Sequence, residues 1–314
     1  MNVAMKHGFK ISLGMILQSM MLGVLILILL GIPILILGSI IGTEVVMNPN
    51  QDPYSMLDSL GSSFGIFFFL FFIYYLILVV FVNSIIYGGL FGASSKAVFE
   101  DQSSIGDVFT YGFKYIFKFA GLFLALIILD IPVYLITIIL TALTQNEFVG
   151  IIGFLLFFLF NISATMYSPI LLVKEDFGIW KSLFTSIKIF FTKFGHSLLI
   201  LLICLIAPVV ILLVYGLISV ILISATGGLA TLYTGEFMLD NPASIIAIII
   251  LYISFYLFIL PLCYSIATIL LTHRYKLKIR PYLFPTQPSG ENNETPAFTF
   301  VEEKNPDKNE DFKF

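Results

Sequence analysis

Six long hydrophobic stretches alternate with seven polar segments along the 314 residues of the chain. Each stretch exceeds the ~20 apolar residues that an α-helix needs to cross ~30 Å of hydrocarbon. Irregular backbone cannot face lipid, and the short alternating segments of a β-barrel do not occur in this sequence, so we expect six spanning helices. Their predicted limits are residues 12–41, 64–92, 119–143, 149–173, 195–224 and 245–272.

Composition supports a membrane-embedded chain. Hydrophobic residues make up 59% of the sequence and charged residues only 11%, whereas a soluble domain carries about 25% charged residues. The first apolar stretch, residues 11–41, is too long for the core of a signal peptide and lacks the small-residue cleavage pattern. We therefore expect this stretch to remain as the first membrane helix.

The charges are sorted between alternate polar segments. All 16 Lys and Arg residues fall in the first, third, fifth and seventh segments. The charged residues of the second, fourth and sixth segments are all acids, namely Glu44, Asp52, Asp58, Glu147, Glu236 and Asp240. Because Lys and Arg in short loops stay on the cytoplasmic side during insertion, we expect a multi-pass protein of the plasma (inner) membrane with both termini cytoplasmic.

Two cytoplasmic connections have the composition of amphipathic helices. Residues 105–118 and 178–193 are short and rich in Phe and Lys, which is typical of helices that lie in the cytoplasmic membrane interface. Trp180 is typical of an interfacial anchor. The candidate contacts with lipid or with a protein partner are Lys114, Lys118, Trp180, Lys181, Lys188 and Lys193.

These two segments resemble each other. The spacing of Phe, Thr and two Lys residues over 109–118 recurs over 184–193, at an offset of 74 to 75 residues. A proline follows at a similar place in the next span, as Ile131-Pro132 and Ala207-Pro208, and a fainter third copy begins at Gly8. We therefore predict three parallel hairpin repeats, unlike the inverted repeats of many transporters. Each has a basic lead-in, a span with proline, an acidic outer loop and a return span.

Five prolines lie within spans or near their ends: Pro33, Pro132, Pro169, Pro208 and Pro261. Each removes a helix hydrogen bond and is expected to kink its helix. The kinks either shape a compact bundle or form hinges around a site, and both interpretations stay open.

Asp130 is the one charged residue placed deep within a predicted span. Charges at this depth are costly and often mark ion paths or ligand contacts, so proton coupling is one interpretation. A protonated carboxyl group that caps a broken helix beside Pro132 is the other. Hydrogen bonds between helices explain the intramembrane amides Asn83 and Asn161, and a polar pocket shared with Asp130 is the alternative.

The chain changes character after the last span. Residues 273–280 are strongly basic and either bind anionic lipid head groups or stop the last helix at the interface. Residues 281–314 are polar and contain several prolines, so we expect a disordered cytoplasmic tail after a membrane domain that covers residues 1–280. The lipid head-group candidates are Arg274, Lys276, Lys278 and Arg280.

Several function classes have no signature in the sequence. The three histidines have no metal-ligand spacing, and the two cysteines lie singly within spans. No phosphate-binding glycine loop or serine-hydrolase elbow occurs, and no basic surface stands clear of the membrane edge to bind nucleic acid. We therefore expect no metal, no cofactor, no nucleic-acid partner and no enzymatic activity.

One stretch resembles a known group of proteins. Residues 171–176 read Leu-Leu-Val-Lys-Glu-Asp, and residues 178–183 read Gly-Ile-Trp-Lys-Ser-Leu before a Lys/Phe-rich lead into the next span. Together with the six-helix topology, this resembles a bacterial superfamily of inner-membrane proteins of unknown function. The superfamily includes the membrane domain attached to some glycerophosphodiester phosphodiesterases. The resemblance covers about residues 1–280 and implies a membrane fold, but no hydrolase activity, since only residues 281–314 follow.

These features favour a non-enzymatic scaffold or accessory protein of the bacterial envelope that works through its cytoplasmic face. The alternative is the membrane subunit of a transporter. In that case the amphipathic segments dock a separate ATPase, or Asp130 couples transport to protons. Membrane lipids and a cytoplasmic protein are the expected partners.

Overall fold

The computed structural model describes residues 2–47, 53–226 and 242–284, and all the regular structure in these ranges is helical. Six segments are long and apolar enough to cross a membrane: Lys6–Ile36, Gly65–Glu100, Ile105–Thr144, Phe148–Lys174, Phe194–Ala225 and Ile245–Leu283. The prediction of an all-α, multi-pass membrane protein is therefore confirmed at this level.

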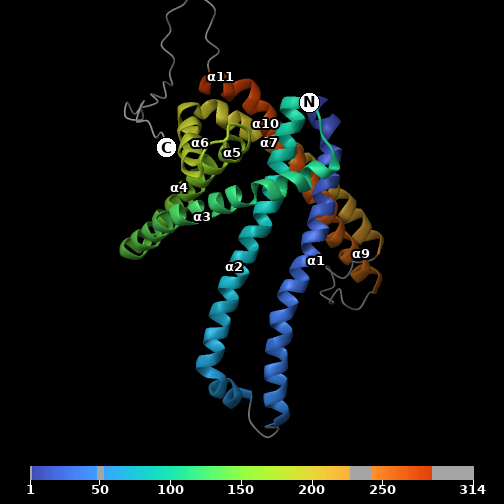
Figure 1. Cartoon of the computed structure of the whole chain (residues 1–314), viewed down its shortest axis with the longest axis vertical. Helices are drawn as coiled ribbons and strands as arrows, with labels where there is room; N and C mark the ends of the chain where they lie inside the picture. Colours follow the sequence, from blue (N-terminus) through green and yellow to red (C-terminus); the bar gives the residue numbers. More distant parts are fainter. Residues whose placement is uncertain (1, 48–52, 227–241, 285–314) are drawn as a thin grey trace, which may run out of the picture.

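Two very long helices open the chain, α1 (Asn2–Met47) and α2 (Pro53–Glu100). Each is about 70 Å long at the ~1.5 Å rise per residue of an α-helix, which is more than twice the ~30 Å thickness of the hydrocarbon layer. In Figure 1 they run from the upper end of the molecule, where the N-terminus lies, to its lower end. Both therefore extend past the limits that hydrophobicity alone predicts.

Helix α3 (Ile105–Thr144) corrects one prediction. Residues 105–118 are not a separate interfacial helix but the first turns of a continuous helix of 40 residues. The backbone N–H of Ser104, the N-cap residue, donates to Asp107 Oδ2 at 2.6 Å, which fixes the helix start. No proline occurs before Pro132 to break the helix, so the amphipathic stretch continues directly into the span.

The predicted span 149–173 is interrupted. Helix α4 (Glu147–Thr165) ends before Tyr167, and the short α5 (Ser168–Lys174) follows. Pro169 lies in the first turn of α5, where its missing N–H removes no helix hydrogen bond. The second amphipathic segment is a helix of its own, α6 (Ile179–Thr192), and leads into α7 (Phe194–Ala225).

The last span contains two wide turns. Helix α9 (Pro242–Ser254) continues through the π-helical η2 (Phe255–Ile259) into α10 (Leu260–Arg274). A second π segment, η3 (Tyr275–Ile279), then leads into α11 (Arg280–Leu283). Each π segment ends directly before an X-Pro pair, Leu260-Pro261 or Arg280-Pro281. Since a proline ring clashes with the carbonyl four residues earlier, the wider turn accommodates it.

The other prolines of the spans, Pro33, Pro132 and Pro208, lie inside α1, α3 and α7 without interrupting them. The first residues of the predicted tail belong to α11, and residues 285–314 lie outside the described ranges. The side chains of the outer-loop acids are also not among those that the structure describes, namely Glu44, Asp52, Asp58, Glu147, Glu236 and Asp240.

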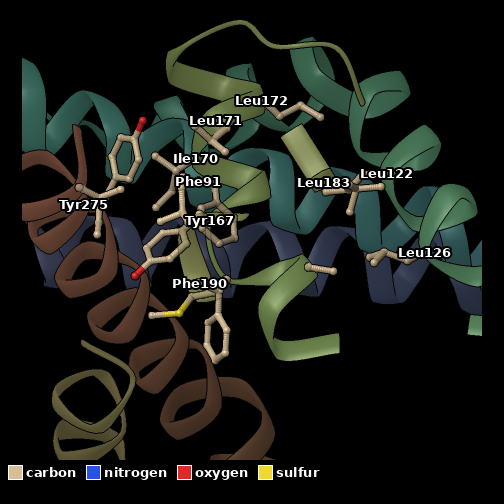
Figure 2. Packing of buried hydrophobic residues seen from close by; sticks show 14 of the residues in the cluster. Phe91, Leu122, Leu126, Tyr167, Ile170, Leu171, Leu172, Leu183, Phe190 and Tyr275 are labelled. Atoms are coloured by element: carbon tan, nitrogen blue, oxygen red, sulfur yellow. The ribbon is translucent and has the colours of Figure 1, made fainter. Parts of the chain in front are cut away.

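The buried core lies at one end of the molecule. Among the side chains that the structure describes, the buried hydrophobic residues of α1 end at Leu22, those of α2 begin at Ile85, and those of α3 end at Leu126. Away from this end, most large apolar side chains are exposed and available to contact lipid. Figure 2 shows the main cluster, where side chains from α2, α3, α5, α6 and η3 meet. Its largest fully buried side chains are Tyr167, Tyr275, Phe119 and Phe190.

Helices α2 and α3 cross in close contact at two glycines. A Cβ atom at Gly89 would lie 2.3 Å from the carbonyl oxygen of Val108, and one at Gly112 would lie 2.7 Å from that of Ile85. Gln18 of α1 reaches the same crossing, where its Nε2 donates to the Ile85 and Val108 carbonyls at 3.3 and 3.4 Å. Any side chain at either glycine would push the two backbones apart.

Gly89→Ala is expected to destabilise the protein by about 1–3 kcal/mol, because the added methyl group must displace the Val108 carbonyl. Gly65→Ala on the same helix meets nothing within 4 Å and is the matched control. It should be neutral or stabilising by up to ~1 kcal/mol, the helix propensity gain. Unfolding of the purified protein in mixed micelles measures both changes. Equal stability of the two variants would contradict a crossing that requires glycine.

Candidate functional site

Helices α5, α6 and α11, the segment η3 and the C-terminal end of α10 gather around the buried core with the adjoining ends of α1, α2 and α3. In Figure 1 they occupy the upper end of the molecule, the same end as the N-terminus. We call this part the head. It contains the candidate lysines and arginines, and its geometry shows which of them have partners within the protein.

Asp101, in the turn between α2 and α3, holds the start of α1. Its carboxylate pairs with Lys6, and its Oδ1 lies 2.9 Å from Nε2 of the buried His7. His7 Nδ1 lies 2.7 Å from Ser103 Oγ on the same turn. The hydrogen bonds from Lys6 and His7 lower the pKa of Asp101.

Two further carboxylates connect separate elements of the head. Lys96 Nζ on α2 donates to Asp107 Oδ1 on α3 at 2.9 Å. Glu175, directly after α5, accepts from Arg280 Nε at 2.8 Å and from Tyr275 Oη at 3.2 Å. Since the Glu175 side chain is only 7% exposed, removal of Arg280 would leave a buried carboxylate without its cation.

Three cations surround the ring of Phe99 near the end of α2. The distances to the ring centroid are 4.5 Å for Lys174 Nζ, 5.1 Å for Lys276 Nζ and 5.5 Å for the Arg280 guanidinium, within the range of cation–π attraction. Lys276 also donates to the carbonyl of Val98 at 2.8 Å. Two of the lipid head-group candidates, Lys276 and Arg280, are therefore engaged within the protein.

The other two lipid candidates have different surroundings. Lys278 is exposed. Arg274 is half-buried and lines a cavity between α1, α7 and α10. The structure thus separates the four candidates into an internal pair, one surface cation and one cation on a cavity.

Helix α6 exposes a row of aromatic and basic side chains. Trp180, Phe184 and Phe191 are 48%, 57% and 52% exposed, although all three are large and aromatic. Lys181 and Lys188 are exposed beside them. The rings of Trp180 and Phe184 stack with their centroids 6.2 Å apart. The structure therefore brings the candidates Trp180, Lys181 and Lys188 together on one helix.

The remaining basic candidates lie apart from this row. Lys118 pairs with Asp176, and this hydrogen bond lowers the pKa of Asp176. Lys193 Nζ lies 3.9 Å from the ring centroid of Tyr282 on α11. Lys114 is exposed on α3. Lys118 and Lys193 thus connect elements of the head.

Asp130 on α3 accepts one hydrogen bond, from Asn161 Nδ2 on α4 at 3.0 Å. Asn83 lies elsewhere on α2, where it donates to the Val79 carbonyl of its own helix at 2.8 Å. It lines a separate cavity of about 240 Å³ between α1, α2 and the end of η2 with α10. The structure therefore brings Asn161 to Asp130 as an interhelical hydrogen bond, but does not add Asn83 to a shared pocket.

The polar contacts that hold the core have no signature in the sequence. Ser186 Oγ of α6 donates to the Ser163 carbonyl at 2.7 Å and accepts from the backbone N–H of Tyr167 at 3.1 Å. Tyr167 Oη and Ser197 Oγ lie 3.1 Å apart. Scattered serines give no sequence signal. The α2–α3 crossing did have one, since residues 88–92 have the G-x-x-x-G pattern of close helix packing.

Within the described ranges, no group of three or more His, Cys, Asp or Glu side chains is placed to hold a metal ion. Comparison with known proteins adds no assignment, because no protein family, no curated protein and no solved structure matches the chain. The resemblance noted above therefore rests on residues 171–183 and on the topology.

Acidification is expected to release the start of α1 from the α2–α3 turn. Because Lys6 and His7 lower the folded-state pKa of Asp101, the stability from this pairing is present above the unfolded value of about 3.9 and is lost as pH falls through the lower folded value. The distribution of distances between spin labels at positions 3 and 102 should broaden when the pH falls through this range.

The matched variants are Asp101→Asn, which should remove this pH dependence, and Glu100→Gln, which should preserve it. A label distance in the unsubstituted protein that stays constant down to pH 2 would show that the Asp101 contacts do not hold α1.

The hydrogen bond between Asp130 and Asn161 is expected to contribute modestly to stability. Leucine at either position and at both positions gives a double-mutant cycle, whose coupling should be about 0.6 kcal/mol, as for other hydrogen bonds between membrane helices. Unfolding in mixed micelles measures it. A coupling near zero would mean that the two side chains do not interact in the folded protein.

Proposed function

We propose that this chain is a non-enzymatic scaffold or accessory protein of the bacterial plasma membrane, with both termini cytoplasmic. It binds a cytoplasmic protein through the exposed row on α6, formed by Trp180, Lys181, Phe184, Lys188 and Phe191. The observation that carries this proposal is the exposure of three large aromatic rings on a helix whose other face is firmly packed.

The packed face holds α6 in one position. Leu183, Ile189 and Phe190 are buried in the core. Ser186 links the helix by hydrogen bonds to the end of α4 and to Tyr167. A surface that is already ordered loses less conformational entropy on binding, so a rigid α6 is suited to recognition.

The chemistry of the row defines the partner. Aromatic side chains that become buried supply most of the binding energy in protein interfaces, and lysines at the rim attract an acidic partner and orient it. The expected partner is therefore a cytoplasmic protein with an apolar, acidic docking surface. Insertion of the same rings into the lipid interface is the competing arrangement.

The three-repeat arrangement also belongs to this proposal. Helix α3 begins with residues 109–118 and contains Pro132, and α6 with α7 has the matching order of residues 184–193 and Pro208. The two copies differ in one respect, because the helix is continuous in the first and interrupted at Lys193 in the second. This arrangement and the resemblance to the bacterial superfamily support a common three-hairpin origin.

The transporter alternative uses the same surface in one of its forms, since an ATPase subunit would be the partner that docks on α6. Its proton-coupled form requires Asp130 to face a polar path. Asp130 has one hydrogen-bond partner, Asn161, and lines none of the described cavities. We therefore place the scaffold first.

A photo-crosslinking amino acid in the full chain, expressed in its native host, tests the proposal. At position 184 it should give one dominant adduct with a protein, because Phe184 is at the centre of the exposed row. At position 217, where Leu217 on α7 is 67% exposed within a span, it should label lipid. Lys181→Glu together with Lys188→Glu should decrease the adduct at position 184 by about tenfold, through charge repulsion with an acidic partner.

The identity of the adduct decides between the alternatives. A soluble non-ATPase protein supports the scaffold, and an ATPase subunit would replace it with the transporter. Lipid adducts at position 184 as at position 217 would overturn the docking role and make α6 an interfacial helix.

A further inference from the structure

A groove between α1, α7 and α10 has a volume of about 600 Å³. This volume is in the range of cavities that hold small-molecule ligands, roughly 300–1,000 Å³. Apolar side chains from all three helices line the groove. Arg274 is the one charged residue among its lining residues. The groove is therefore suited to a ligand with a long apolar part and a single anionic group.

One face of α10 gives the groove its length. Leu262, Ile266, Leu270 and Arg274 line it at intervals of four residues, so they lie in one row along the helix. The row is about 18 Å long at the ~1.5 Å rise per residue. This length is close to one leaflet of the hydrocarbon layer, which is roughly half of ~30 Å.

Arg274 is a half-buried cation that has no ion pair or hydrogen bond within the described ranges. Its neighbours in the basic segment differ from it, since Lys276 donates to the Val98 carbonyl and Arg280 pairs with Glu175. No acidic residue lines the groove. A guanidinium in this position lacks a partner that a phosphate group would supply in bidentate form.

We propose that the groove binds one anionic phospholipid of the leaflet at the basic ends of the helices. The phosphate contacts Arg274, and one acyl chain lies along Leu270, Ile266 and Leu262 toward the middle of the membrane. Membrane lipid surrounds the spanning helices at this depth. Basic pockets between membrane helices at the cytoplasmic side favour anionic head groups. This site does not depend on the docking role of α6.

Reconstitution of the full chain in phosphatidylcholine vesicles tests the proposal. The probe is phosphatidylglycerol that carries a photoreactive acyl chain, at about one tenth of the lipid, and the same chain on phosphatidylcholine is the comparison. Mapped adducts should gather on Leu262 and Ile266. Labelling there should be about tenfold stronger with the anionic probe, the size of one charge-assisted hydrogen bond.

Two pairs of variants separate the head group from the chain. Arg274→Gln should reduce labelling by the anionic probe to the level of the zwitterionic one, whereas Lys278→Gln, which removes an exposed charge nearby, should not. Gly8→Leu should block both probes, because Gly8 lines the groove and a Cβ there would lie 3.8 Å from Ile266 and 3.9 Å from Ile269 of α10. Gly23→Leu on the same helix meets nothing within 4 Å and is its control.

Equal groove labelling by the two probes in the unsubstituted protein would overturn head-group selection. Adducts on Leu262 and Ile266 no more frequent than on the lipid-facing Leu217 would overturn the groove as a lipid site. Crosslinks between two copies of the chain at these positions would assign the groove to self-association instead.

Discussion

The close contact of α2 and α3 at Gly89 and Gly112 is the constraint on which the head depends. Apolar side chains gain little when they leave lipid for other apolar side chains, so membrane helices associate through close packing and hydrogen bonds. At this crossing the backbones meet directly, and Gln18 bonds to a carbonyl of each helix. Three helices are thereby fixed at one level, and α5, α6 and α10 pack around them.

The cations of the head divide by whether a partner is within reach. Lys96 and Arg280 have carboxylates, and Lys276 has a backbone carbonyl. These contacts join segments far apart in the sequence, so their main role is to fix the geometry. Arg274 faces apolar side chains instead. A charge without a partner is costly where water is scarce. The position of Arg274 is therefore better evidence of a ligand than the net charge of residues 273–280.

The number and the helical nature of the spans follow from the sequence, because hydrophobic length and backbone satisfaction leave few alternatives. The local courses of the helices do not. Residues 105–118 and 178–193 have similar composition, yet the first continues into its span and the second ends at Thr192. The sequence also does not predict which polar side chains form hydrogen bonds with each other. The sequence places Asn83 and Asn161 at similar depth, and only packing decides which one meets Asp130.

The exposed row of α6 and the groove at Arg274 lie on different helices, but the same buried contacts support both. Directly after Arg274, Tyr275 donates to Glu175, and its ring lies 6.3 Å from that of Tyr167. The backbone N–H of Tyr167 in turn bonds to Ser186 of α6. A ligand that binds only the folded head stabilises it by mass action. An anionic lipid on Arg274 would therefore strengthen the same packing that holds the α6 row in place, without occupying that row.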